Sequence, residues 1–525
     1  MTYILRQGEN DLCCCTEYFV ESKDGLHLYT RVAVPKGASK CSTVLKRTPY
    51  ESIPEQIPKA ADDSLLQAGY AVVTQHCRGR GGSEGECIPY LHEGEDSLDF
   101  IHWACTLPHF NGELYLVGGS YGATVWLMLP DFPQEVKGAI IEVQTDRLYD
   151  RHYVNGLVRG FVGADWQLNM MSRSHPRLPE ISNEQIYRRP YKDIVKRALG
   201  VRVPFFEQAL LHNIQDEYWT GMPSHNSMEK IHCPVLLVGG WYDFYTHGMC
   251  SMWERMLPQT REKSCFLMGP YGHGTRVQNS DMPLPHGDLP GDYRLQWLEH
   301  LRTGKPYRYG NPGSFCYYSV GADEWREKRL ICFPGKEGQT GQDFYFSADK
   351  TLTRETPSKA FCSWDYDPEQ PCRCFLPNRL CRAFPPSSMD NVLSFESSPF
   401  EKKSDYFGCV RFSLCVSSTA EDTAFYLRLY LVRFGEAYAL GEIAGALLAL
   451  NASAKPERQA LIEMHTHPLA FTLLPGDRLR VDVTSSAPEF VPHPNMKGHW
   501  AEVEASKPCR NTIYFGASHI TLYPG

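Results

Sequence analysis

The sequence predicts an α/β domain with a helical cap insertion, followed by a C-terminal β jelly roll. Three observations carry this prediction. Short apolar strands alternate with helical patterns from about residue 18 to residue 129, a stretch without strand alternation then runs to about residue 230, and apolar residues repeat with a period of two after about residue 303. A chain of 525 residues is also long enough for about three domains of roughly 150 residues.

Residues 1–143 form the first part of the predicted α/β domain. Apolar strands that alternate with helices are typical of a mostly parallel sheet. The first strand is expected to begin at about residue 16. The clearest elements after it are strand 43–45, helix 60–67, strand 70–74, helix 96–105 and strand 114–117.

The helical cap is predicted at residues 144–231, where Tyr, Arg, Met and Asn are frequent and strand alternation is absent. Strand patterns return at Pro234–Val238 and Ser264–Met268, separated by the helical run Gly248–Met256. We therefore expect residues 232–303 to complete the sheet that the first part begins.

Residues 304–525 are predicted to form a separate all-β domain. Apolar residues alternate with polar ones at 410–416 and again at 479–483, and a Pro-Gly-Asp turn signal stands at 475–477. Many short alternating strands with such turns are typical of an antiparallel sandwich of the jelly-roll kind.

The composition is that of an ordinary folded protein and excludes several partners. Apolar residues make up 42% and charged residues 22% of the chain, which argues against disorder and coiled coils. The net charge is −8 and no basic stripe is present, so nucleic acid is not an expected partner. The most apolar run, 439–450, is shorter than the ~20 residues that a membrane-spanning helix needs, so no membrane partner is expected.

The cysteines and the N-terminal residues predict a cytoplasmic protein. The first residues lack the basic and apolar segments of a secretory signal. The 19 cysteines are an odd number at low density, so free thiols are expected rather than a disulfide scaffold. Cys372, Cys374 and Cys381 cluster without a second ligand pair at zinc spacing, and neither a metal nor an organic cofactor is predicted.

Two segments match the pattern G-x-S-x-G, and their surroundings decide between them. Gly118–Gly122 follows an apolar strand and opens a helical run, which is the strand-turn-helix setting of a nucleophile elbow. Gly81–Gly85 lies in a glycine-rich loop that no helix follows. Ser120 is therefore the predicted nucleophile, and Ser83 is the less favoured alternative.

Asp243 and His273 are the predicted partners of Ser120. A serine needs a base to remove its proton, and the base needs a carboxylate to hold its tautomer. Asp243 ends the segment VLLVGGWYD, and His273 follows the strand in FLMGPYGHG. The order Ser, Asp, His favours catalysis over the alternatives, which are a helix N-cap for Asp243 and an ordinary loop position for His273.

In the combination of its motifs the chain resembles the cocaine esterase/X-prolyl dipeptidyl-peptidase family of serine hydrolases, the CocE/NonD or S15 group. The matching segments are, in chain order, DGLHLYTRVAVP, KRTPY, RGRGGSEG, EGED followed by Trp103, GGSYG, GGWYD, GPYGHG and PGDRLRVDV. The resemblance implies an α/β-hydrolase domain with a helical cap and a C-terminal jelly roll. It implies Ser120 as nucleophile, His273 as base and Asp243 as the orienting acid.

The same resemblance assigns Tyr50, in the segment RTPY, as a side-chain donor to an oxyanion hole; a packing aromatic is the alternative. On physical grounds the second donor is expected to be the backbone N–H of Tyr121, the residue after the nucleophile. Candidates for the substrate pocket are Trp166 and Tyr149 in the cap.

Two positions depart from the family pattern. His76 stands where the family usually has Asp before x-Arg-Gly, and Ala123 stands where many members have Gly. His76 is expected to anchor the RGRGGSEG loop rather than to act as a base.

Together these residues predict hydrolysis of a small-molecule carboxylic ester or small amide through an acyl-enzyme. No extra N-terminal helical region is seen before the first strand, which favours such substrates over X-prolyl peptides. An X-prolyl aminopeptidase or α-amino acid ester hydrolase is the first alternative, with Asp146, Asp150 and Asp165 as candidates to hold a substrate ammonium. A carbohydrate-binding protein on an inactive hydrolase scaffold is the second. Exposed sheet edges would allow a homo-oligomer.

Overall fold

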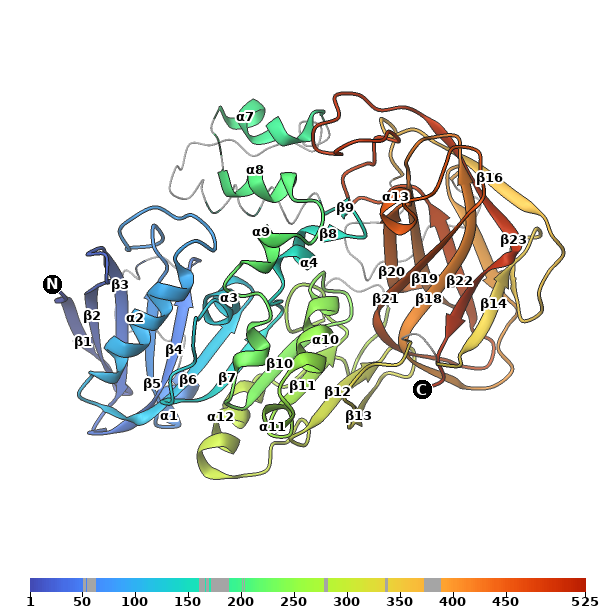
Figure 1. Cartoon of the computed structure of the whole chain (residues 1–525). Helices are drawn as coiled ribbons and strands as arrows, with labels where there is room; N and C mark the ends of the chain where they lie inside the picture. Colours follow the sequence, from blue (N-terminus) through green and yellow to red (C-terminus); the bar gives the residue numbers. More distant parts are fainter. Residues whose placement is uncertain are drawn as a thin grey trace.

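The computed structural model describes residues 1–50, 53, 63–159, 166, 170, 188–200, 202, 204–277, 282–335, 339–372 and 389–525. An open α/β sheet forms one end of the molecule, a curled β domain forms the other, and the cap helices lie above the junction between them (Figure 1). The predicted fold class is thus confirmed.

An 11-stranded sheet organises the first part of the chain, in the order β1-β2-β3-β5-β4-β6-β7-β10-β11-β12-β13. Strands β5 to β12 in this order pair in parallel, and the outer strands pair antiparallel. The carboxyl ends of the parallel strands therefore meet at one edge. The bounds are β1 Tyr3–Glu9, β2 Cys13–Glu21, β3 His27–Pro35, β4 Cys41–Thr48, β5 Ala71–His76, β6 Phe110–Gly119, β7 Val136–Glu142, β10 Val235–Gly240, β11 Cys265–Gly269, β12 Ser314–Ser319 and β13 Glu324–Lys328.

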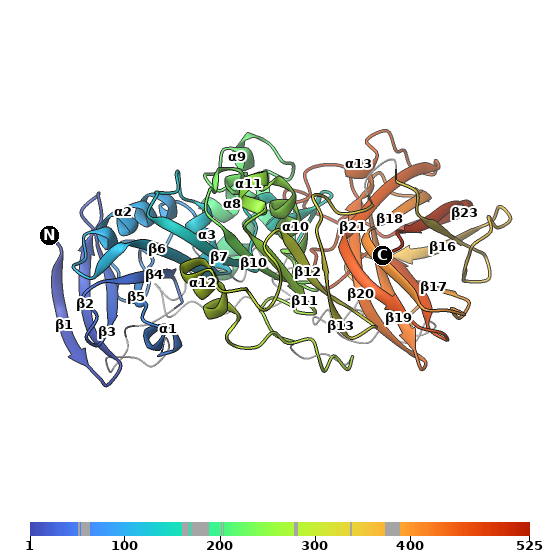
Figure 2. The same cartoon turned by 90° about the horizontal axis from the view of Figure 1, so that it is seen from below.

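Helices cover both faces of this sheet, as the alternating sequence pattern requires. Phe100, Ala123 and Met249 bury one face, whereas Leu66 and Trp297 belong to clusters on the other. Figure 2 shows the helices on the two sides of the sheet. The bounds are α1 Asp63–Gln67, α2 Glu93–Cys105, α3 Tyr121–Leu127, α10 Thr246–Arg255, α11 Pro258–Arg261 and α12 Tyr293–Thr303.

The sheet extends further than predicted at both ends. It starts with β1 at Tyr3 rather than at about residue 16; most residues of β1 are exposed on the sheet edge, so no burial pattern marks this strand. At the other end, helix α12 is a crossover that leads into β12, which pairs in parallel with β11. Strands β12 and β13 therefore continue this sheet past residue 304, where the sequence predicts the all-β domain to begin.

The cap between β7 and β10 is built from short elements. Its described parts are α4 Leu148–His152, β8 Tyr153–Val154, β9 Leu157–Val158, the 3-10 turn Tyr191–Asp193, α7 Ile194–Leu199, α8 Pro204–Leu211, α9 Glu217–Thr220 and the 3-10 turn Ser227–Lys230. Lys192 N–H donates to the carbonyl of Ala501 at 2.9 Å, so the cap is tied to the β domain. Within the described residues, no helix has the length and apolar character to cross a membrane.

The C-terminal domain is a 10-stranded sheet with one path in the order β20-β19-β22-β17-β15-β14-β23-β18-β21, and β16 pairs with β23. Long antiparallel pairs such as β18 with β21 reflect the period-two pattern of the sequence. The bounds are β14 Gln342–Phe346, β15 Thr351–Thr353, β16 Phe361–Tyr366, β17 Leu393–Ser397, β18 Ser404–Ser418, β19 Ala424–Arg433, β20 Glu436–Ala446, α13 Leu447–Leu450, β21 Ala460–Leu473, β22 Arg478–Thr484 and β23 Cys509–Leu522.

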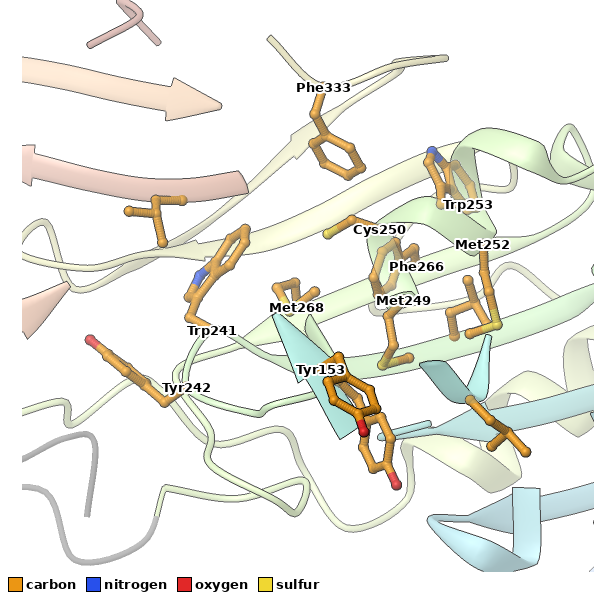
Figure 3. Close-up of a cluster of buried hydrophobic side chains, with 14 of the residues drawn as sticks. Tyr153, Trp241, Tyr242, Met249, Cys250, Met252, Trp253, Phe266, Met268 and Phe333 are labelled. Atoms are coloured by element: carbon orange, nitrogen blue, oxygen red, sulfur yellow. The ribbon is translucent and has the colours of Figure 1, made fainter. Parts of the chain in front are cut away.

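The two domains share buried contacts behind the end of β10. Trp241 and Tyr242 belong to the same buried cluster as aromatic and sulfur side chains of α10 and β11. In Figure 3 Trp241 lies toward Met268, whereas the ring of Tyr242 points away from that group. The Tyr242 hydroxyl donates to the carbonyl of Ala439 at 3.0 Å, and His467 Nε2 lies 3.0 Å from the carbonyl of Trp241. The β domain thus binds the loop that follows β10.

Candidate active site

Ser120 occupies a strained turn between β6 and α3. Its backbone has φ 53° and ψ −126°, a conformation that costs a non-glycine residue of order 1–3 kcal/mol. The flanking glycines make the turn possible, because a Cβ on Gly118 would lie 1.9 Å from the carbonyl oxygen of Gly122. The N–H of Ser120 donates to the carbonyl of Glu142 at 3.0 Å, which fixes the turn to the end of β7.

His273 and Asp243 meet Ser120 at the carboxyl edge of the sheet. The Nε2 atom of His273 lies 3.0 Å from Ser120 Oγ, and its Nδ1 atom lies 3.2 and 3.3 Å from the two carboxylate oxygens of Asp243. Asp243 is fully buried, whereas His273 is 36% exposed. A chain of hydrogen bonds from acid to base to hydroxyl is the arrangement that activates a serine nucleophile.

Neighbouring groups hold this chain in place. The N–H of Tyr245 donates to Asp243 Oδ1 at 3.2 Å. The ring of Phe244 stacks on His273 with the centroids 4.7 Å apart. The imidazole is therefore oriented by a carboxylate at one edge and by an aromatic face beside it.

The hydroxyl of Ser83, the alternative nucleophile, makes two hydrogen bonds to backbone groups. Its Oγ donates to the carbonyl of His76 at 2.8 Å and accepts the N–H of Tyr29 at 2.9 Å. The His76 Nδ1 atom lies 3.3 Å from the N–H of Gly82 and so contacts the loop that it was expected to anchor.

Tyr50 and Tyr121 lie at the ends of β4 and β6. Tyr50 is 41% exposed, and Trp166 Nε1 donates to its hydroxyl at 3.3 Å. Tyr121 is the first residue of α3, so its N–H has no acceptor one turn earlier in the helix. Tyr50 and Tyr121 both follow strands that end at the edge of the sheet where Ser120 lies.

The two pocket candidates in the cap lie in different surroundings. The ring of Trp166 lies 5.0 Å from that of Tyr121, beside the nucleophile turn. Tyr149 donates to the carbonyl of Asn213 at 3.0 Å and lines a separate cavity of about 280 Å³ against the β domain. None of Ser120, Asp243 and His273 lines that cavity.

Two of the three acids proposed to hold a substrate ammonium, Asp146 and Asp150, have different surroundings in the described structure. Asp146 is fully buried and pairs with Arg255 at 2.6 Å. Asp150 lies in the cavity beside Tyr149, where burial raises the pKa of its carboxyl. Asp165 lies outside the described residues, as do Cys374 and Cys381. No group of three or more His, Cys, Asp or Glu side chains suited to a metal occurs among the residues that the structure describes.

A charged network beneath the nucleophile turn was not predicted. The buried Arg47 guanidinium binds Glu93, and Glu93 accepts the Tyr121 hydroxyl at 2.8 Å. Burial, together with the charge of Glu93, holds the pKa of Tyr121 well above its usual value, so its hydroxyl stays protonated as a donor. The signal for this network in the sequence is the acidic segment Glu93–Asp96, whose carboxylates have no local partner that would indicate their role.

Comparisons with known proteins agree with this organisation. The model of the X-Pro dipeptidyl-peptidase (S15) family matches residues 24–275, and the model of the X-Pro dipeptidyl-peptidase C-terminal non-catalytic domain matches residues 321–521. A cocaine esterase of Rhodococcus sp. (strain MB1 Bresler) is 24% identical over 555 residues, which cover 95% of this chain and 96% of the esterase.

Two solved structures share the fold over nearly their full length. An aminopeptidase from the marine sediment archaeon Thaumarchaeota archaeon superposes with a TM-score of 0.84 at 20% identity, covering 99% of this chain and 98% of that one. An α-amino acid ester hydrolase has a TM-score of 0.84 at 20% identity, covering 100% of this chain and 98% of that one.

Proposed function

The chain belongs to the X-Pro dipeptidyl-peptidase (S15) family of serine hydrolases, and from this premise we propose that it cleaves carboxylic esters or small amides with Ser120, His273 and Asp243. The observation that carries the proposal is the 3.0 Å contact between Ser120 Oγ and His273 Nε2, with Asp243 at the other imidazole nitrogen. Such a chain of contacts converts a weak hydroxyl into a nucleophile.

In the first step Ser120 Oγ attacks the substrate carbonyl while His273 Nε2 takes the hydroxyl proton. Asp243 holds the Nδ1 proton of the imidazole and stabilises the imidazolium that forms. His273 then donates its proton to the leaving alcohol or amine, and the acyl group remains on Ser120.

The negative charge that develops on the substrate oxygen needs donors already in place. The Tyr50 hydroxyl and the Tyr121 N–H are the proposed donors, and neither has to transfer a proton. In the second step His273 removes a proton from water, which attacks the acyl-enzyme. His273 then returns that proton to the departing Ser120 Oγ, and the acid is released.

The family names leave esters and N-terminal peptide bonds as candidate substrates, and the surroundings of the two described cap acids, Asp146 and Asp150, favour esters. An aminopeptidase must pair a substrate ammonium with carboxylates near the nucleophile. Asp146 is instead committed to Arg255 and to the N–H of Met228, and Asp150 lines the cavity of Tyr149. Turnover of p-nitrophenyl esters should therefore exceed that of Xaa-Pro p-nitroanilides; strong preference for the anilide would refute the ester assignment.

The decisive experiment is intact mass after incubation with a fluorophosphonate, followed by mapping of the labelled peptide. We expect one adduct on the peptide that contains Ser120 and none on Ser120→Ala. An unlabelled folded protein, or an adduct on Ser83, would contradict the proposal and favour a binding protein on an inactive scaffold.

We further propose a cytoplasmic location, since the described cysteines are free thiols.

A further inference from the structure

A network of buried charges connects the two segments that carry the proposed oxyanion donors. At its centre is Arg47, the penultimate residue of β4, whose side chain is completely buried. Its Nη1 atom donates to Glu93 Oε2 at 3.0 Å, to the Glu93 carbonyl at 3.1 Å and to Ser97 Oγ at 2.8 Å. Arg47 thereby joins the end of β4 to the first turns of α2.

Glu93 extends the network to the nucleophile turn. Its second oxygen, Oε1, accepts the hydroxyl of Tyr121 at 2.8 Å, and that hydroxyl in turn accepts the N–H of Tyr90 at 2.9 Å. Tyr121 is 1% exposed and Glu93 is 6% exposed, so both ends of this bond are shielded from water. Tyr121, whose N–H is a proposed oxyanion donor, is therefore fixed in position by the hydrogen bonds of its hydroxyl.

The other end of the network leads to Tyr50. Arg47 precedes Tyr50 by three residues, and its carbonyl oxygen lies 3.3 Å from the position that a Cβ on Gly122 would take. Between them, Thr48 Oγ1 accepts the N–H of Tyr50 at 3.1 Å. The backbone of Arg47 thus lies close beside Gly122, with little room for a larger side chain there, and its side chain binds Glu93.

We propose that Glu93 is a positioning residue that sets the separation of the two oxyanion donors, acting on Tyr121 through its hydroxyl and on the Tyr50 segment through Arg47. The inference rests on the proposed function. Its physical basis is that oxyanion donors act only when they are aimed at the developing charge, and that small displacements of catalytic groups reduce rates strongly. Buried charges are also costly to desolvate, so an apolar filling of this space would serve stability as well or better.

The β domain offers a matched control with the same chemistry. There the hydroxyl of Tyr426 donates to Glu442 Oε2 at 2.5 Å, and Arg428 Nη2 donates to the same oxygen at 2.7 Å. Tyr426 and Arg428 are buried, as Tyr121 and Arg47 are. None of the described hydrogen bonds and ion pairs of this second tyrosine, glutamate and arginine set is made to Ser120 or the proposed donors, so the set serves as the control for losing such a bond in the β domain.

The test compares Tyr121→Phe and Glu93→Gln with Tyr426→Phe and Glu442→Gln. Tyr121→Phe keeps the backbone N–H and removes the hydroxyl, which takes away the bond to Glu93 and the acceptor of the Tyr90 N–H. We expect kcat for a p-nitrophenyl ester to fall about 10- to 100-fold, less than the loss of a whole oxyanion donor, with KM changed by less than about threefold. Affinity for a trifluoromethyl ketone, whose bound adduct carries an oxyanion, should fall by the same factor as kcat/KM, while inhibition by the product acid stays nearly constant.

The β-domain variants should lose thermal stability without changing any of these ratios. Equal losses of kcat in both pairs, or a Tyr121→Phe enzyme with full kcat and full affinity for the ketone, would overturn the inference. If Tyr121→Phe fails to fold, Glu93→Gln carries the test, and failure of both to fold would assign the network to stability and likewise overturn it. Labelling of wild-type Ser120 by a fluorophosphonate separates these results from failure of the proposed function.

Discussion

The α/β sheet and the β domain each bury charge, but they place it differently. In the α/β sheet the buried Arg47 and Glu93 stand at the ends of elements, next to the turn that holds Ser120. In the β domain the ion pairs of Arg428 with Glu442 and of Arg480 with Asp482 lie within strands. A buried charge at the end of a strand can position a reacting group, whereas a buried ion pair within paired strands contributes only to the stability of the sheet. The following substitutions test this difference.

The largest effect is expected for Ser120→Ala, which removes the proposed nucleophile. We expect kcat for ester hydrolysis to fall about 10⁶-fold, as in other serine hydrolases. The fold should persist, because the side chain's only described hydrogen bond is to His273. Ester turnover and a thermal melt check this result, and Ser83→Ala, which loses two structural hydrogen bonds, should keep its fluorophosphonate labelling.

Asp243→Asn should lower kcat about 10⁴-fold, because an amide would stabilise the wrong imidazole tautomer. The carboxylate accepts from both His273 and the N–H of Tyr245, and the substitution preserves the shape of the side chain. Steady-state kinetics over a pH series would measure the loss. A variant with more than a tenth of wild-type kcat would show that another group orients His273.

Asp482→Asn is the counterpart within the β domain and should act on stability alone. Asp482 is buried and accepts from Arg480 Nε at 2.7 Å and Nη2 at 2.8 Å. Breaking a buried pair by removing one charge costs about 3–5 kcal/mol. Chemical denaturation should show this loss, while kcat of the remaining folded enzyme stays at the wild-type value; a parallel loss of kcat would erase the contrast between the domains.

Tyr50→Phe should lower kcat about 10²- to 10³-fold, corresponding to about 2.7–4 kcal/mol for one oxyanion donor. The hydroxyl already accepts a bond from Trp166 Nε1, so it is oriented before substrate binds. Comparing kcat with KM distinguishes this role from packing, since a packing residue would change KM or stability first.

The smallest effect is expected at the carboxylate of Asp24, which binds Arg78 in the glycine-rich loop. The Arg78 guanidinium lowers the pKa of Asp24 to about 2. A depressed pKa means that the stabilisation is present above about pH 4 and is lost as the pH falls toward 2. Asp24→Asn should therefore be slightly less stable than wild type at pH 6, and the two melting temperatures should converge near pH 2; a constant difference would exclude this ion pair as the cause.

The parts of this molecule that were predictable from sequence are those whose signals are local. Ser120 stands in a strand-turn-helix segment, and Asp243 and His273 each follow a strand, so their order along the chain could be interpreted without any contact map. Strand β1 is not predicted from the sequence, because its apolar residues are exposed at the sheet edge and do not alternate with polar ones.

Contacts between distant segments could not be inferred in the same way. Arg47 and Glu93 are 46 residues apart, and nothing in either segment indicates that one binds the other. The cap posed the same difficulty: Tyr149 and Trp166 are close in sequence, yet the first lines the cavity against the β domain and the second lies beside Tyr121.

The contacts behind β10 have a consequence for how this enzyme can be divided. The loop from Trp241 to Asp243 is bound by Ala439 and His467, which belong to the domain whose family model is called non-catalytic. A chain that ends after β13, at residue 328, would keep Ser120, Asp243 and His273 and lose the two described contacts that restrain the residues preceding Asp243. When parts are exchanged between relatives, the two domains should therefore be moved together. In the α/β domain alone, the segment that carries the Asp243 carboxylate would be less restrained.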